Sequence, residues 1–221
     1  MALVNALTTL PDVKTLLGIT DSTQDARLEL IVNACSRRIE QYCGRNFTRA
    51  SLTETYTPSG RQLLILRNYP IVSVSSVVDQ GNTLVQGTDY IFSPEYANSG
   101  FLYRENGWNG PTVNRDFLTT DTVAGKRTII VTYVAGYYLP ADLGYVAGAS
   151  TSLPFDLNYA CARLACSDFV LARQGNFGGL TAMSEGGLSY SWGTPITNNA
   201  SGISQEVAGM LNKYKRLAIT A

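Results

Sequence analysis

The sequence predicts an α+β fold, in which a helical bundle carries an inserted antiparallel β-sheet or small barrel. Near both ends of the chain apolar residues recur every three or four positions, whereas in the middle they alternate. Hydrophobic residues make up 45% of the 221 residues, enough for one large domain or two small ones. We therefore expect N-terminal helices in 1–50, an inserted β region in 51–136, a connection and long central helix in 137–174, and an extended arm and C-terminal helix in 175–221.

Two helices are expected at the N-terminus. Thr9 and Asp12 have the spacing of a capping pair, and Gly18 is placed to end the first helix. The second begins with the same spacing at Ser22 and Asp25 and runs to Gly44. Its apolar side carries Leu28, Ile31, Cys35, Ile39 and Tyr42. Its polar side is explained most simply as a solvated face, although a phosphate-facing patch at Arg37, Arg38 and Arg45 is an alternative.

The middle of the chain has the alternating pattern of strands. The segments expected to be strands are 63–66, 71–78, 89–92, 100–104 and 127–134. Gly81 and Asn82 separate two of them as a hairpin turn does. Residues 105–126 are rich in Asn, Gly, Thr and Asp and predict a long loop.

The central helix is expected from Leu153 to Gln174, with Ser152 as its N-cap and Gly175 at its end. It is apolar nearly all round, which indicates burial among several neighbours. The segment 175–202 then predicts either disorder or an arm that becomes ordered against a partner.

The last helix begins near Ser204, and its apolar stripe must dock on its own domain or on another protein; both remain open. The partner-binding candidates are this stripe and two aromatic residues of the arm: Tyr190, Trp192, Val207, Met210, Leu211, Tyr214 and Leu217.

We expect no catalytic residue, no metal site and no cofactor. The chain has no histidine, which removes the commonest general base and metal ligand. The four cysteines, Cys35, Cys43, Cys161 and Cys166, are expected as buried hydrophobic residues in a reducing cytoplasm. An alternative is a glycosidase-like pair among the sheet carboxylates Glu54, Asp79, Asp89, Glu95 and Glu105. Another is a sugar-binding or base-stacking surface that includes Tyr103 and Trp108.

The order of segments resembles the head-tail connector, or adaptor, proteins of tailed bacteriophages. DVKTLLGITDSTQDARLELIVNACSRRIEQYCGRNF is similar to their N-terminal helix pair and YPIVSVSSVVDQGNTLVQGTDYIF to their sheet entry. TIIVTYVAGY and LPFDLNYACARLA resemble the final strand and central helix, and GGLTAMSEGGLSYSW and EVAGMLNKYKRL the arm and terminal helix. Residues 138–151 look inserted by comparison, and 105–126 match nothing in the family.

This resemblance implies a structural protein of the virion neck, made in the host cytoplasm. It implies a closed ring of identical subunits, about twelve as in portal rings. Its partners would be the portal protein above, the tail or next neck protein below, and genomic DNA passing nonspecifically through the lumen, with no membrane. With 17 basic and 17 acidic residues, the wall would not hold the DNA strongly. The competing functions are a carbohydrate-binding or glycan-hydrolysing virion protein and a DNA-packaging accessory.

Overall fold

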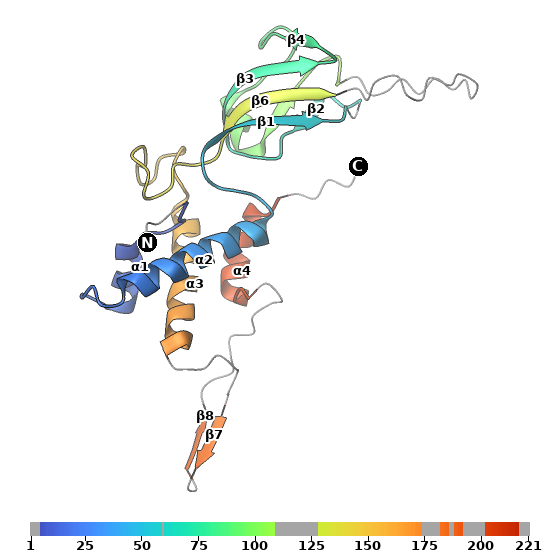
Figure 1. The fold of residues 1–221 in the computed structure, drawn as a ribbon. Coiled ribbons are helices and arrows are strands. Elements are labelled where there is room, and N and C mark those ends of the chain that lie inside the picture. Colours follow the sequence, from blue (N-terminus) through green and yellow to red (C-terminus); the bar gives the residue numbers. More distant parts are fainter. Residues whose placement is uncertain are drawn as a thin grey trace. The chain divides into compact units, whose positions relative to one another are not determined.

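The described part of the protein is an α+β structure with four α-helices and antiparallel strands, drawn from a computed structural model in Figure 1. The structure describes residues 5–58, 60–108, 128–173, 182–185, 188–191 and 202–216. Its contacts divide the chain into two units. The helical unit contains Met1–Phe47 and Tyr138–Ala221, and the β unit contains Thr48–Tyr137.

The two N-terminal helices are α1 (Leu10–Leu17) and α2 (Asp25–Cys43), as predicted. The Thr9 side chain accepts a hydrogen bond from the backbone N–H of Asp12, so the first predicted cap is confirmed. The predicted cap of α2 at Ser22 is wrong, because the residue before the helix is Gln24 and no side chain there accepts from the first N–H groups of α2. Asp21 instead accepts bonds from the N–H and hydroxyl of Thr23, which fixes the turn before the helix.

The central helix α3 (Phe155–Arg173) packs against α1, α2 and α4 (Gln205–Leu211). It begins two residues later than expected, and the Ser152 hydroxyl accepts from the backbone N–H of Val146 in the preceding connection. The helix buries residues on most of its circumference, as its composition predicts: Leu157, Asn158, Ala160, Cys161, Ala162, Leu164, Ala165, Cys166 and Phe169.

In addition to apolar packing, buried polar contacts tie the residues just before α1 to α2 and α3. The Thr8 hydroxyl donates to the Asn158 side chain at 2.9 Å, and the backbone N–H of Leu7 donates to Ser36 Oγ at 3.1 Å. All four cysteines are buried free thiols, as expected. In the part of the chain described, no helix has the length and apolarity needed to cross a bilayer.

The main sheet of the β unit has the strand order β1-β6-β3-β4. Its strands are β1 (Ala50–Tyr56), β3 (Ile71–Asp79), β4 (Asn82–Leu84) and β6 (Ile129–Ala135), all paired antiparallel. β2 (Leu63–Ile65) and β5 (Phe101–Tyr103) form a separate antiparallel pair. A short 3₁₀ helix, Pro94–Ser99, precedes β5.

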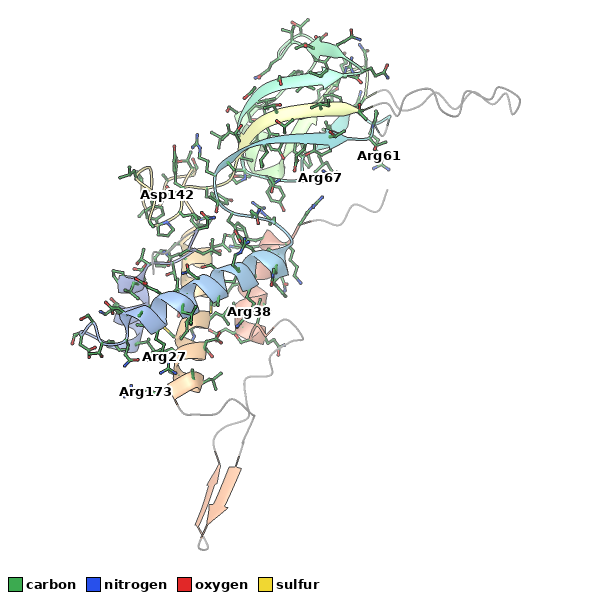
Figure 2. The ribbon with its side chains drawn as sticks, in the orientation of Figure 1. Arg27, Arg38, Arg61, Arg67, Asp142 and Arg173 are labelled. Atoms are coloured by element: carbon green, nitrogen blue, oxygen red, sulfur yellow. The ribbon has the colours of Figure 1, made fainter. Side chains whose placement is uncertain are left out.

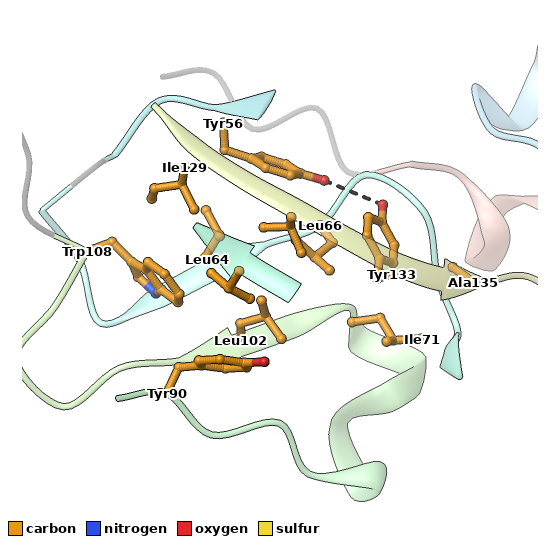
Figure 3. Close-up of a cluster of buried hydrophobic side chains, with 12 residues drawn as sticks. Tyr56, Leu64, Leu66, Ile71, Tyr90, Leu102, Trp108, Ile129, Tyr133 and Ala135 are labelled. Atoms are coloured by element: carbon orange, nitrogen blue, oxygen red, sulfur yellow. Dashed lines mark hydrogen bonds between the residues drawn. The ribbon is translucent and has the colours of Figure 1, made fainter. Parts of the chain in front are cut away.

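Side chains from both sheets fill the core of the β unit, shown in Figure 3. Trp108 and Tyr133 are its largest fully buried members. The inner face of β6 supplies Ile129, Val131, Tyr133 and Ala135, so the alternation seen in the sequence is the alternation of this face.

Two expectations in the β unit need correction. The hairpin turn consists of Gln80 and Gly81, because Asp79 pairs with Asn82. Both turn residues have positive φ, of 52° and 84°, as a two-residue hairpin loop requires. The predicted strand 89–92 is wrong, since it forms only isolated bridges at Tyr90 and Ile91. The Asp89 side chain and backbone both bond back to Val85, and this compact turn uses groups that a strand would pair.

The segment expected as an arm contains a β-hairpin in its described part. β7 (Ala182–Glu185) pairs antiparallel with β8 (Leu188–Ser191), and Ser184 lies opposite Ser189. The rest of the predicted arm, the predicted end of the central helix at Gly175 and most of the 105–126 loop lie outside the described residues.

Candidate partner-binding surface

The C-terminal segment 202–216 docks on the helical unit. The Ser204 hydroxyl accepts from the N–H of Val207, which confirms the predicted helix start. Val207 and Leu211 are buried with 1% and 0% of their surface exposed, and Ile203 before the helix is also at 0%. The helix ends at Leu211 and continues as a 3₁₀ turn to Tyr214.

Polar contacts hold the end of this segment. The Tyr214 hydroxyl donates to Asp156 at 2.6 Å, and Lys213 forms an ion pair with the same carboxylate. Burial acts to raise the pKa of Asp156, but the hydrogen bonds from Lys213 and Tyr214 outweigh it and hold this pKa below its ordinary value. The backbone N–H of Arg216 donates to the carbonyl of Cys43 at 2.8 Å. The segment is therefore tied to both α2 and α3.

The seven predicted partner-binding residues have different positions. Val207 and Leu211 are packed inside their own helical unit, whereas Met210 and Tyr214 are half-buried at its surface. Tyr190 lies in β8. Trp192 and Leu217 lie outside the described residues. Of the two docking modes left open by the sequence, the structure has the intramolecular one.

Several apolar side chains of the helical unit are exposed in the α3 region and in the connection before it. Phe155 at the start of α3 is 77% exposed, and Tyr159, one turn further on, is 37% exposed. Leu143 and Val146, in the connection before α3, are 110% and 62% exposed. Exposed apolar side chains become candidates for contact with another protein where they gather in one patch. The all-round apolar character of α3 was the signal in the sequence for the exposure of Phe155 and Tyr159.

The arginines considered as a phosphate-facing patch have partners within the protein. Arg38, labelled in Figure 2, donates to Asp168 at 3.0 Å and to the carbonyl of Gly202 at 3.2 Å. Arg37 donates to Glu40 at 2.9 Å, and the Arg45 guanidinium lies 4.9 Å from the centre of the Phe47 ring. The Arg38 contacts join α2 to α3 and to Gly202, whereas the Arg37 and Arg45 contacts are local.

Glu54 lies on the inner face of β1 at the centre of a hydrogen-bonded cluster in the β unit. It accepts from the hydroxyl of Tyr133 at 2.6 Å, from the hydroxyl of Tyr56, and from the Asn68 side chain at 3.1 Å. The two hydroxyls in turn accept from the backbone N–H groups of Arg67 and Asn68. The cluster therefore ties the loop after β2 to the main sheet.

Burial raises the pKa of both tyrosines, and the bonds to Glu54 raise it further, to about 12 for Tyr133. Both hydroxyls therefore stay protonated donors at neutral pH. Among the other carboxylates considered for a glycosidase pair, Asp79 bonds Arg104 at 2.7 Å and Asp89 bonds the N–H of Val85. Each of these three carboxylates has a structural partner.

The described residues contain no group of three or more cysteine, aspartate or glutamate side chains placed to hold a metal ion. The aromatic residues considered for ligand stacking are also in structural positions. Trp108 is fully buried and donates its indole N–H to the carbonyl of Gln62 at 3.1 Å, and Tyr103 lies in β5.

Comparison with known proteins identifies the family. No curated protein matches the chain in a sequence search. A family model described as head completion protein matches residues 6–217, which is nearly the whole sequence. This match supports the resemblance to phage head-tail connectors seen in the segment order. The chain belongs to the head completion protein family.

Proposed function

We propose that this protein is a structural head-tail connector of a tailed bacteriophage. Copies of the chain form a ring of about twelve under the portal, and the ring joins the DNA-filled capsid to the tail or the next neck protein. The observation that carries the proposal is the family match over residues 6–217, since the family has a structural role in completing the phage head.

The surface of the helical unit supports a role in assembly. Leu143 is fully exposed and Phe155 is 77% exposed, and burying such apolar side chains against another protein would be favourable. We propose that the exposed residues Leu143, Val146, Phe155 and Tyr159 contact the portal protein or a neighbouring subunit. Repeated modest contacts around a closed ring sum to tight attachment.

Met210, Tyr214, Tyr190, Trp192 and Leu217 stay partner-binding candidates. Val207 and Leu211 contribute to the same contact only by holding the C-terminal segment in place. The balance of 17 basic and 17 acidic residues supports a lumen that lets DNA pass without retaining it. Our prediction for the domain arrangement is a helical bundle with an inserted antiparallel β-sheet or small barrel. Its boundaries lie near residues 50, 136 and 174.

Native mass spectrometry of the purified protein, alone and with the portal protein of the same phage, tests this function. We expect a discrete ring bound to portal. Phe155→Asp should weaken that complex tenfold or more, because it places a charge in a dry contact. Gln41→Asp, at an exposed position on α2, is the matched control and should bind normally. A chain that never forms rings and never binds portal refutes the proposal.

A further inference from the structure

The main sheet has an edge that no described residue covers. β1 is its outermost strand and pairs with β6 in unbroken register, from Ala50 opposite Ala135 to Tyr56 opposite Ile129. Each strand in a sheet has backbone donors and acceptors on two sides. On the outer side of β1, no described residue hydrogen-bonds to the backbone of residues 50–56. The strand therefore presents a row of free N–H and C=O groups.

The opposite edge of the same sheet has features that discourage pairing, and β1 lacks them among the described residues. β4 has only three residues, and its neighbour β3 has two register irregularities. Shortness, bulges, proline and lysine are the usual devices that stop a sheet edge from pairing with another chain. β1 has seven residues, no register shift, no proline and no lysine. Its one charged side chain, Glu54, is engaged on the inner face by Tyr133 and Asn68.

The β7–β8 hairpin also lacks a neighbouring strand among the described residues. Its two strands of four residues pair with each other and with no other described strand. A lone two-stranded hairpin is marginally stable in water, and a third strand is the usual remedy. Its outer edges offer the same unpaired backbone groups that β1 offers.

We propose that the β7–β8 hairpin of one copy adds to the free edge of β1 in a second copy, extending its four-stranded sheet. This inference rests on the proposed assembly of copies. Each chain supplies one hairpin and one β1 edge, so the contact is head-to-tail and every edge finds a partner when the ring closes. Backbone hydrogen bonds supply the attraction in such strand addition. β1 is long enough for either four-residue strand to pair along its whole length.

Disulfide trapping between two differently tagged chains tests this contact. One chain carries Thr55→Cys, on the exposed outer face of β1. The other carries a single cysteine at Met183, Ser184, Ser189 or Tyr190, which together sample both strands and both faces of the hairpin. The native cysteines are buried and will not compete. The chains are mixed, assembled with portal, oxidised mildly and analysed on a non-reducing gel.

The control chain carries Ile130→Cys. Ile130 lies directly opposite Thr55 on β6 and is also exposed, but it is one strand further from the edge. We expect at least one hairpin position to form an interchain disulfide with Thr55→Cys in the assembly. The yield with Ile130→Cys should be at least fivefold lower, because neighbouring strands lie about 4.8 Å apart.

Three results overturn the inference: rings without interchain product, disulfides confined within one chain, or disulfides that join Thr55→Cys to itself between copies. The mass of the same sample distinguishes failure of the strand addition from failure of the proposed function. Rings that form without the hairpin disulfide refute the strand addition and leave the proposed function intact. A sample that stays monomeric with portal refutes the proposed function, and the strand addition with it.

Discussion

Replacing Tyr133 by phenylalanine should destabilise the β unit by about 2–3 kcal/mol. The substitution keeps the buried ring and removes a hydroxyl that donates to Glu54 at 2.6 Å and accepts from the N–H of Asn68 at 3.2 Å. A hydrogen bond to a charged group contributes about 1.5–3 kcal/mol, and a donor left unpaired costs about 1–3 kcal/mol. Glu54 is partly exposed and keeps two other donors, so the lower part of the combined range applies.

Tyr90→Phe is the matched control. Tyr90 belongs to the same core and is 3% exposed, but its hydroxyl makes no hydrogen bond to another described residue, and burial alone raises its pKa. This substitution should change the free energy of unfolding by no more than about 0.5 kcal/mol. Urea unfolding followed by the fluorescence of the buried Trp108, in a Trp192→Phe background, reports on the β unit. Equal losses for Tyr133→Phe and Tyr90→Phe would refute the role given to the cluster.

Three further predictions concern other parts of the chain. Gly136→Ala should lower stability by about 1–3 kcal/mol or more in urea unfolding, because Gly136 has a φ of 104° and an added Cβ would overlap the Thr48 carbonyl; near-wild-type stability would contradict this. The pKa of Asp156 is depressed in the folded state, so its contribution is present above its ordinary value of 3.8 and is lost as the pH falls below it. The protection of the C-terminal segment against hydrogen exchange, relative to the intrinsic rate at each pH, should therefore fall below about pH 4. Asp156→Asn should have lower protection at pH 7 and no such loss in acid. A loss of unchanged size in the variant would contradict the role of Asp156. The buried thiols, with the pKa of Cys161 raised by burial to about 12, should react with a thiol reagent at pH 8 only after unfolding, and rapid labelling of the native protein would be inconsistent with their burial.

Local signals in the sequence predicted the elements whose ends are set by local chemistry. Thr9 and Ser204 cap helices where expected, since a hydroxyl and the N–H groups it accepts from lie within three residues. The alternating stretch that became β6 follows a buried inner face and an exposed outer one, which is also a property of the segment itself.

The failures arose where specific side-chain hydrogen bonds decide the outcome. Residues 89–92 have the composition of a strand, but Asp89 bonds to Val85 and closes a turn instead. β1 was not recognised as a strand, because its inner face carries Glu54, and only the tyrosines and amide that surround this carboxylate make it compatible with a core. Periodicity contains no information about such hydrogen-bond partners.

The candidate site could be predicted only in part. The stripe of the last helix was recognised, yet whether Val207 and Leu211 face their own unit or a partner depends on the shape of α2 and α3, which the stripe does not encode. Exposure of Phe155 was also hidden, because an apolar residue at the start of an apolar helix looks the same whether it is covered or not.

Electron cryo-microscopy of the neck in intact virions tests the central claim most directly. We predict a closed ring of about twelve copies of this chain between the portal and the tail, with DNA density on the ring axis. Density for this chain elsewhere in the particle, or as isolated copies that do not encircle the axis, would contradict it.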